Sequence, residues 1–114
     1  MPRPLHIFPA LVLCLIGMAA SAAETPGPQR QEELLYLLHQ DCGSCHGMTL
    51  KGGLGPSLLP QALEGKSASY LRHVIAKGVP GKAMPPWENI LEPTEIDFLV
   101  KYLSKPDTGG EQKL

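Results

Sequence analysis

The sequence predicts an all-α fold, and three observations support that class. Apolar residues recur at helical spacing in three segments, glycine- and proline-rich stretches connect them, and no run alternates apolar and polar residues for long enough to form a strand. We therefore expect three main helices joined by long loops. Loops of this length in so small a domain usually wrap or bind something.

Residues 1–22 have the pattern of a secretory signal peptide. A basic front with Arg3 precedes an apolar run from Ile7 to Ala20, and small residues follow it like an A-x-A cleavage site. The run is shorter than the roughly 20 residues that span a bilayer, so an uncleaved anchor is the less favoured alternative. Export would remove Cys14 and place the mature protein in the periplasm of a Gram-negative bacterium, without stable membrane insertion.

The mature chain is too short for two domains. Removal of 22 of the 114 residues leaves 92, with nine basic and 11 acidic residues and a net charge of −2. This balance gives no basic field for nucleic acid. We expect a monomeric domain at 28–105, a flexible lead at 23–27 and a disordered tail at 106–114.

The first helix is expected from about Gln29 to Cys42. An apolar stripe at steps of three and four residues ends in both thiols of the mature chain and consists of Leu35, Leu38, Cys42 and Cys45. This stripe directs the two cysteines toward the interior.

The second helix should begin after Ser67, a suitable N-cap, and stop at Gly78, a residue type that favours the end of a helix. Its apolar face is formed by Tyr70, Leu71, Val74 and Ile75.

The third helix should begin with Pro93 at its first position. Its buried face is expected to consist of Ile96, Leu99, Val100 and Leu103, with Phe98 and Tyr102 along a flank.

The segment Cys42-Gly43-Ser44-Cys45-His46 carries the chemistry of the chain. C-x-x-C-H is the sequence pattern of c-type haem attachment. Its spacing on a helical turn brings both sulfurs to one porphyrin edge for thioether bonds, and the adjacent histidine ligates the iron. In an exported chain the motif predicts one covalently bound haem c, which the long loops would wrap.

Three other interpretations of the cysteine pair compete with haem. A structural disulfide between Cys42 and Cys45 suits an oxidising compartment. A thioredoxin-like dithiol would need a neighbouring βαβ pattern, and a zinc site would need a second pair of ligands, and neither is found in the sequence. Haem attachment is therefore favoured, with the disulfide as the main alternative.

Met84 is the expected sixth iron ligand. The other mature methionine, Met48, follows His46 too closely to reach the opposite haem face, whereas two prolines after Met84 stiffen the loop that carries it. The rival ligands His39 and His73 are expected on the surface. Pro56 is the candidate to supply a backbone carbonyl that orients the His46 ring.

With these residues the chain resembles the class I monohaem cytochromes c. The motif, Gly55-Pro56-x-Leu58, Met84-Pro85 and a terminal helix at 96–103 stand in the family's order and cover nearly the whole mature domain. The resemblance implies thioether bonds at Cys42 and Cys45, axial ligation by His46 and Met84, and the Pro56 carbonyl on the His46 ring. It also implies that the first and third helices cross, with Tyr102 at the crossing.

The region from Asp41 to Trp87 is also similar to the small periplasmic cytochromes c associated with the haem c and haem d-containing nitrite reductase of denitrifying bacteria. The similarity includes Met84-Pro85-Pro86-Trp87. It implies electron donation to that reductase or a part in maturing its haem d, and the sequence leaves both open.

Single-electron transport, rather than catalysis, is the function that these residues predict. Two filled axial positions leave the iron no place for a substrate. The haem edge would be framed by the 51–54 and 81–86 loops, where Lys51 and Lys82 are either partner contacts or ordinary solvated charges. The alternative is a haem enzyme or gas sensor in which Met84 leaves the sixth position open.

Overall fold

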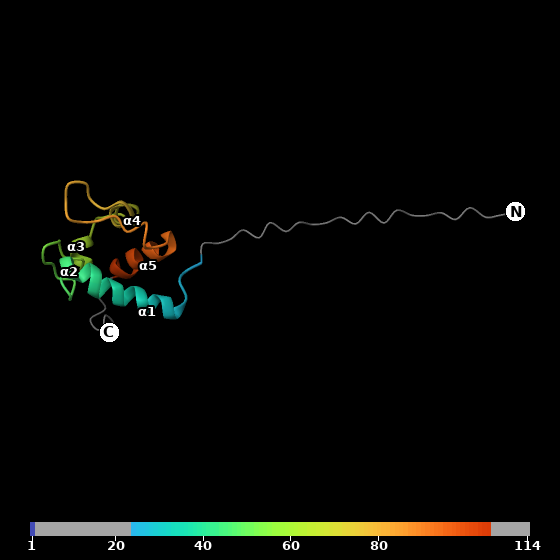
Figure 1. Cartoon of the computed structure of the whole chain (residues 1–114), viewed down its shortest axis with the longest axis horizontal. Helices are drawn as coiled ribbons and strands as arrows, with labels where there is room; N and C mark the ends of the chain where they lie inside the picture. Colours follow the sequence, from blue (N-terminus) through green and yellow to red (C-terminus); the bar gives the residue numbers. More distant parts are fainter. Residues whose placement is uncertain (2–23, 106–114) are drawn as a thin grey trace.

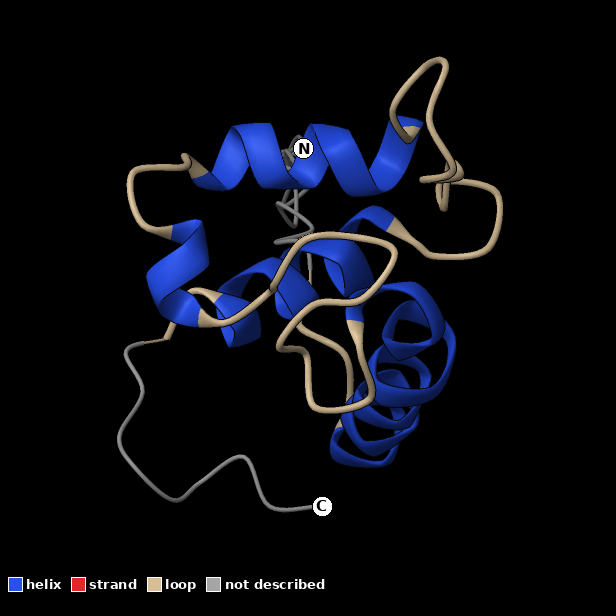
Figure 2. Cartoon of the chain, turned by 90° about the vertical axis from the view of Figure 1, so that its left-hand side faces the viewer, coloured by secondary structure: helices blue, strands red, loops and turns tan. Residues whose placement is uncertain are grey.

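The structure, a computed structural model, describes Met1 and residues 24–105 (Figure 1). Helices joined by loops make up this part, and within residues 24–105 there is no strand (Figure 2). The all-α prediction is thus confirmed. The predicted signal peptide beyond Met1 and the predicted tail at 106–114 lie outside the described residues. No helix of the described part is both long and apolar enough to cross a membrane.

The first helical segment is longer and less regular than expected. Helix α1 (Pro28–Leu37) continues without a gap into the π-helix η1 (Leu38–Cys42) and then into α2 (Gly43–His46). The Gly43 amide donates to the Leu38 carbonyl, which is the i→i+5 bond of a π-turn. The helical segment thus runs four residues beyond the predicted end at about Cys42 and stops where Gly47 has a φ of 88°.

The second predicted helix is present as α4 (Ala68–Lys77), and both of its predicted ends are confirmed. The Ser67 hydroxyl accepts a hydrogen bond from the Tyr70 amide at 3.1 Å, and the chain leaves the helix at Gly78 with a φ of 69°. A short helix that the sequence pattern does not predict, α3 (Pro60–Leu63), precedes α4.

The third predicted helix is α5 (Pro93–Leu103), with Pro93 in its first turn. The four side chains expected on its buried face are all buried, as predicted: Ile96, Leu99, Val100 and Leu103. A reciprocal capping box also fixes the start of α5, since the Glu92 and Glu95 side chains each accept a hydrogen bond from the other's backbone amide.

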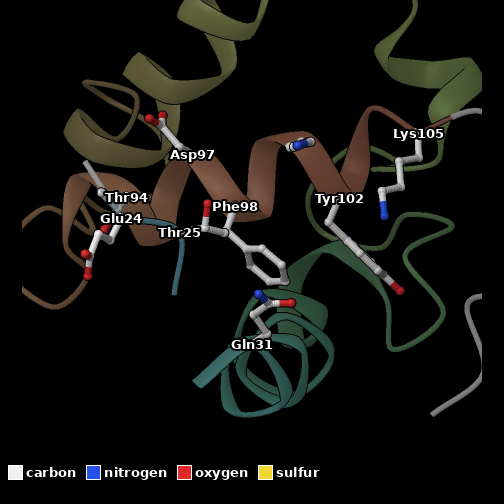
Figure 3. A pocket seen from close by; sticks show the side chains of 9 residues that line it. Glu24, Thr25, Gln31, Thr94, Asp97, Phe98, Tyr102 and Lys105 are labelled. Carbon is white, nitrogen blue, oxygen red and sulfur yellow. The ribbon is translucent and has the colours of Figure 1, made fainter. Parts of the chain in front are cut away.

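Helix α5 forms the centre of the fold and contacts both α1 and α4 (Figure 1). Arg30 of α1 donates to Glu95 at 2.6 Å, and Arg72 of α4 pairs with Asp97. Where α5 passes α1, the stacked rings of Phe98 and Tyr102 project toward α1 (Figure 3), and their centroids are 6.5 Å apart. The contact of the first and third predicted helices agrees with what the resemblance implies.

Candidate haem-binding site

The two cysteines of the motif lie in consecutive helical turns and are both free thiols. Cys42 ends η1 and Cys45 lies in α2, and each is half-buried. Burial raises the pKa of the Cys42 thiol to about 11, and the carboxylate of Asp41 adds to the shift. A thioredoxin-like dithiol would lie beside a βαβ unit, and residues 24–105 contain no strand.

The ring of His46 is held by the backbone of the following loop. Its Nδ1 lies 2.7 Å from the carbonyl oxygen of Pro56. Because a carbonyl only accepts hydrogen bonds, Nδ1 is the donor, and in the neutral ring Nε2 then keeps its lone pair. This is the tautomer and the fixed ring orientation that a metal-ligating histidine requires.

Glycines allow the loop at 47–58 to pack closely against the motif. The Gly52 and Gly55 amides donate to the carbonyls of His46 and Cys45, each at 2.8 Å. A Cβ atom on Gly55 would lie 2.8 Å from the His46 ring, closer than real Cβ atoms approach. The Gly-Pro pair therefore positions His46 in two ways, since Gly55 leaves room for the ring and the Pro56 carbonyl accepts a hydrogen bond from its Nδ1–H group.

Met84 lies in a loop that is held by backbone hydrogen bonds at the C-terminal end of α4. The Val79 amide donates to the Met84 carbonyl at 3.1 Å, and the Trp87 amide donates to the Ile75 carbonyl at 3.0 Å. The Met84 side chain is half-buried. In Figure 1 this gold loop extends toward the same end of the folded part as α2, which carries His46. The role of Met84 as a ligand stays a prediction.

One histidine is placed differently from the sequence prediction. His39 was expected on the surface, but it is only 8% exposed, and its Nδ1 lies 3.1 Å from the Met48 carbonyl oxygen. His39 stands four residues after Leu35 and four before Gly43, which places it beside the apolar stripe. That spacing could have indicated burial. His73 of α4 is exposed, as predicted.

The residues present fit a covalently attached haem. Two free thiols and an oriented imidazole stand together on one helical segment. Helix α4 supplies apolar surface as well, because Leu71, Val74 and Ile75 are half-buried and none of the α4 residues is fully buried. The motif segment therefore supplies two attachment points and one oriented nitrogen donor, and α4 adds apolar side chains that are partly open to solvent.

Comparison with known proteins identifies the family of the chain. The family described as cytochrome c oxidase, cbb3-type, subunit III matches residues 29–103. Cytochrome c55X of Paracoccus denitrificans is 42% identical over 99 residues, which cover 86% of this chain and 96% of that protein. The dihydro-heme d1 dehydrogenase of Pseudomonas aeruginosa is 39% identical over 89 residues, 78% of this chain but 17% of that protein.

A solved structure shares the fold. The c-type cytochrome NirC superposes with a TM-score of 0.68 at 47% sequence identity, and the match covers 69% of this chain and 93% of that one. The similarity therefore extends over nearly the whole of that small protein.

Proposed function

The chain belongs to the c-type cytochromes of the cbb3-type subunit III family, and from that premise we propose that it carries one haem c and transfers single electrons in the periplasm. The observation that carries the proposal is the His46–Pro56 hydrogen bond, because it leaves Nε2 free to ligate iron. Cys42 and Cys45 would hold the group through thioether bonds. When bound, the haem supplies a one-electron couple whose potential depends on its axial ligands.

Whether Met84 ligates the iron distinguishes an electron carrier from a haem enzyme. With His46 on one face and Met84 on the other, the chain would fill both axial positions, so that electrons pass without any bond to a substrate. The fastening of its loop to α4 supports this role, since backbone hydrogen bonds on both sides of Met84 limit where its sulfur can move.

The test of Met84 is the sulfur-to-iron charge-transfer band in the red region of the oxidised spectrum. We expect the band in the wild type, its loss in Met84→Ala and its retention in Met48→Ala. Met48 is the matched control because it is the other methionine of the predicted mature chain and is 52% exposed. An unchanged spectrum in Met84→Ala, or a five-coordinate wild type, would favour an enzyme or gas sensor with an open position instead.

The proposed redox partner is a respiratory reductase, namely the nitrite reductase that contains haem c and haem d. The similarity of residues 41–87 to the cytochromes associated with that enzyme supports the proposal. Mixing the reduced protein with the reductase and nitrite should reoxidise it, which absorbance at the haem bands would follow. If the reductase leaves it reduced, this partner is excluded while electron transport itself is unaffected.

A second candidate function is a part in maturing haem d. The observation that favours this role is the 39% identity between this chain and a segment of a dihydro-heme d1 dehydrogenase. In this role the oxidised chain would accept electrons released when the dehydrogenase acts on dihydro-heme d1. Reduction of the chain in that mixture, together with no reoxidation by nitrite reductase, would favour maturation over respiration.

A further inference from the structure

A buried hydrogen bond connects the two sides of the haem-attachment motif. His39 precedes Cys42 and Met48 follows His46, and the His39 Nδ1 lies 3.1 Å from the Met48 carbonyl oxygen. Since the carbonyl only accepts, Nδ1 donates. The His39 side chain is only 8% exposed, so little water can replace it as a donor. The bond therefore closes a ring of backbone around the whole motif.

Met48 also packs closely against Gly43, in the turn that follows His39. A Cβ atom on Gly43 would lie 3.2 Å from the Met48 Cα, so the first turn of α2 and the start of the loop are in direct contact. Gly43 also donates the π-type bond to Leu38 that ends η1. Single π-turns frequently occur at functional sites. Here the π-turn places His39, Gly43 and Met48 at one junction.

The loop beyond this junction holds a strained backbone conformation. Leu50 has a φ of 60°, which leucine rarely adopts, and its side chain is only 1% exposed. Such strain persists only where the surroundings over-determine the conformation. The Leu50 carbonyl accepts from the Leu58 amide at 2.9 Å and from the Ser57 hydroxyl at 3.2 Å. Leu50 thus links the junction to the residues that directly follow Pro56.

We propose that His39 is a positioning residue for His46. By holding the Met48 carbonyl, His39 fixes the strained turn at Leu50, which in turn fixes the segment whose Pro56 carbonyl orients the His46 ring. The inference rests on the proposed ligation by His46 and deepens it. The hydrogen bond to the ring raises the basicity of a ligating histidine, so a residue that fixes the acceptor also sets the reduction potential.

Three variants of the haem-loaded protein test the proposal. His39→Leu removes the donor, and His39→Asn keeps an N–H group at the δ position. His73→Leu is the matched control, since His73 is exposed on α4. In His39→Leu we expect amide hydrogen exchange at Leu50 and Leu58 to accelerate about 2- to 10-fold, the range of one net hydrogen bond. The reduction potential should rise as the Pro56 contact loosens.

The variants separate positioning from simple packing. His39→Asn should keep exchange and potential near the wild-type values, and His73→Leu should change neither. Equal losses in His39→Asn and His39→Leu, or wild-type exchange in both, would overturn the proposal. Should His39→Leu fail to fold, His39→Ala, which also removes the donor, takes its place in the same comparison with His39→Asn. A wild type without covalent haem would overturn the proposed function, and the exchange rates would still report whether His39 fixes the loop.

Discussion

The two loops that carry the proposed iron environment are held in different ways. The loop at 47–58 is bonded directly to the residues it serves, through the amides of Gly52 and Gly55 and the carbonyl of Pro56. The loop at 79–87 is bonded to the end of α4, and the hydrogen bond shown for Met84 involves its backbone carbonyl. The His46 ring is thus fixed by contacts of its own, whereas the Met84 sulfur depends on the closure of its loop.

The largest expected effect is the loss of covalent haem when the two cysteines of the motif are replaced. Replacing Cys42 and Cys45 together by alanine should abolish covalent haem, because no thiol then remains in the predicted mature chain to form a thioether bond. Haem staining after denaturing electrophoresis would measure the loss, which should be complete. Ser44→Ala is the control, since it alters the motif without removing a thiol. Persistent staining of the double variant would contradict haem attachment at this motif.

The second largest effect is expected from Gly78→Ala, which should disturb the loop that carries Met84 and leave the loop at 47–58 unchanged. Gly78 has a φ of 69° and a ψ of −168°, a conformation that is essentially restricted to glycine, and a Cβ atom there would lie 2.6 Å from the Met84 carbonyl oxygen. The backbone cost of Gly78→Ala alone is about 1–3 kcal/mol, and the steric clash adds to it. Denaturant unfolding should show this loss of stability, and the charge-transfer band should weaken.

Gly81→Ala is the matched control for Gly78→Ala. Gly81 lies in the same loop and also has a positive φ, of 75°, but a Cβ atom there would meet no atom within 4 Å. We expect Gly81→Ala to keep the charge-transfer band. If both variants lose the band equally, backbone flexibility rather than the contact of Gly78 with Met84 positions the sulfur.

A smaller effect should fall on the His46 side. Gly55→Ala would place a Cβ atom 2.8 Å from the His46 ring, and overpacking of this kind costs about 1–3 kcal/mol. Because the ring must shift away from Pro56, we expect the reduction potential to rise while the charge-transfer band persists. Gly27→Ala is the control, since a Cβ atom on Gly27 meets nothing within 4 Å. Loss of the band in Gly55→Ala would show that the two loops are not independent.

The sequence predicted best those features that depend on neighbouring residues. The ends of α4 follow from the side chain of Ser67 and the backbone of Gly78, and both are local. The hydrogen bond from the His46 ring to Pro56 was expected because the acceptor follows the motif within a short glycine-rich loop. These features needed no knowledge of the packing of distant segments.

The features that the sequence did not predict depend on packing between segments. The π-turn η1 and the burial of His39 arise where the helix meets the returning loop at Met48, a contact that a helical period alone does not reveal. The ion pair of Arg30 with Glu95 joins residues 65 positions apart. A sequence pattern shows each partner separately and gives no signal that they meet.

The smallest effect tests the helix crossing that supports both loops. Glu95 of α5 accepts from Arg30 at 2.6 Å and from the Glu92 amide at 2.8 Å, and its side chain is 11% exposed. The hydrogen bond from Arg30 is the main cause that holds the pKa of Glu95 below its ordinary value, against the opposing effect of burial. At pH values between the two pKa values the unfolded chain therefore binds the proton that the folded protein excludes.

Acid should accordingly weaken the fold through Glu95. Its contribution is complete above the ordinary pKa of a glutamate and is lost as the pH falls through the lowered value. Glu95→Gln should flatten the pH dependence of the unfolding free energy in this acid range, whereas Glu32→Gln, an exposed position on α1, should not. Parallel pH profiles for the wild type and Glu95→Gln would contradict the assignment. Because α5 supports the whole fold, the protection factors of amides in the loops at 47–58 and 79–87, which are corrected for the intrinsic exchange rate at each pH, should fall together on acidification, unlike in Gly78→Ala or Gly55→Ala.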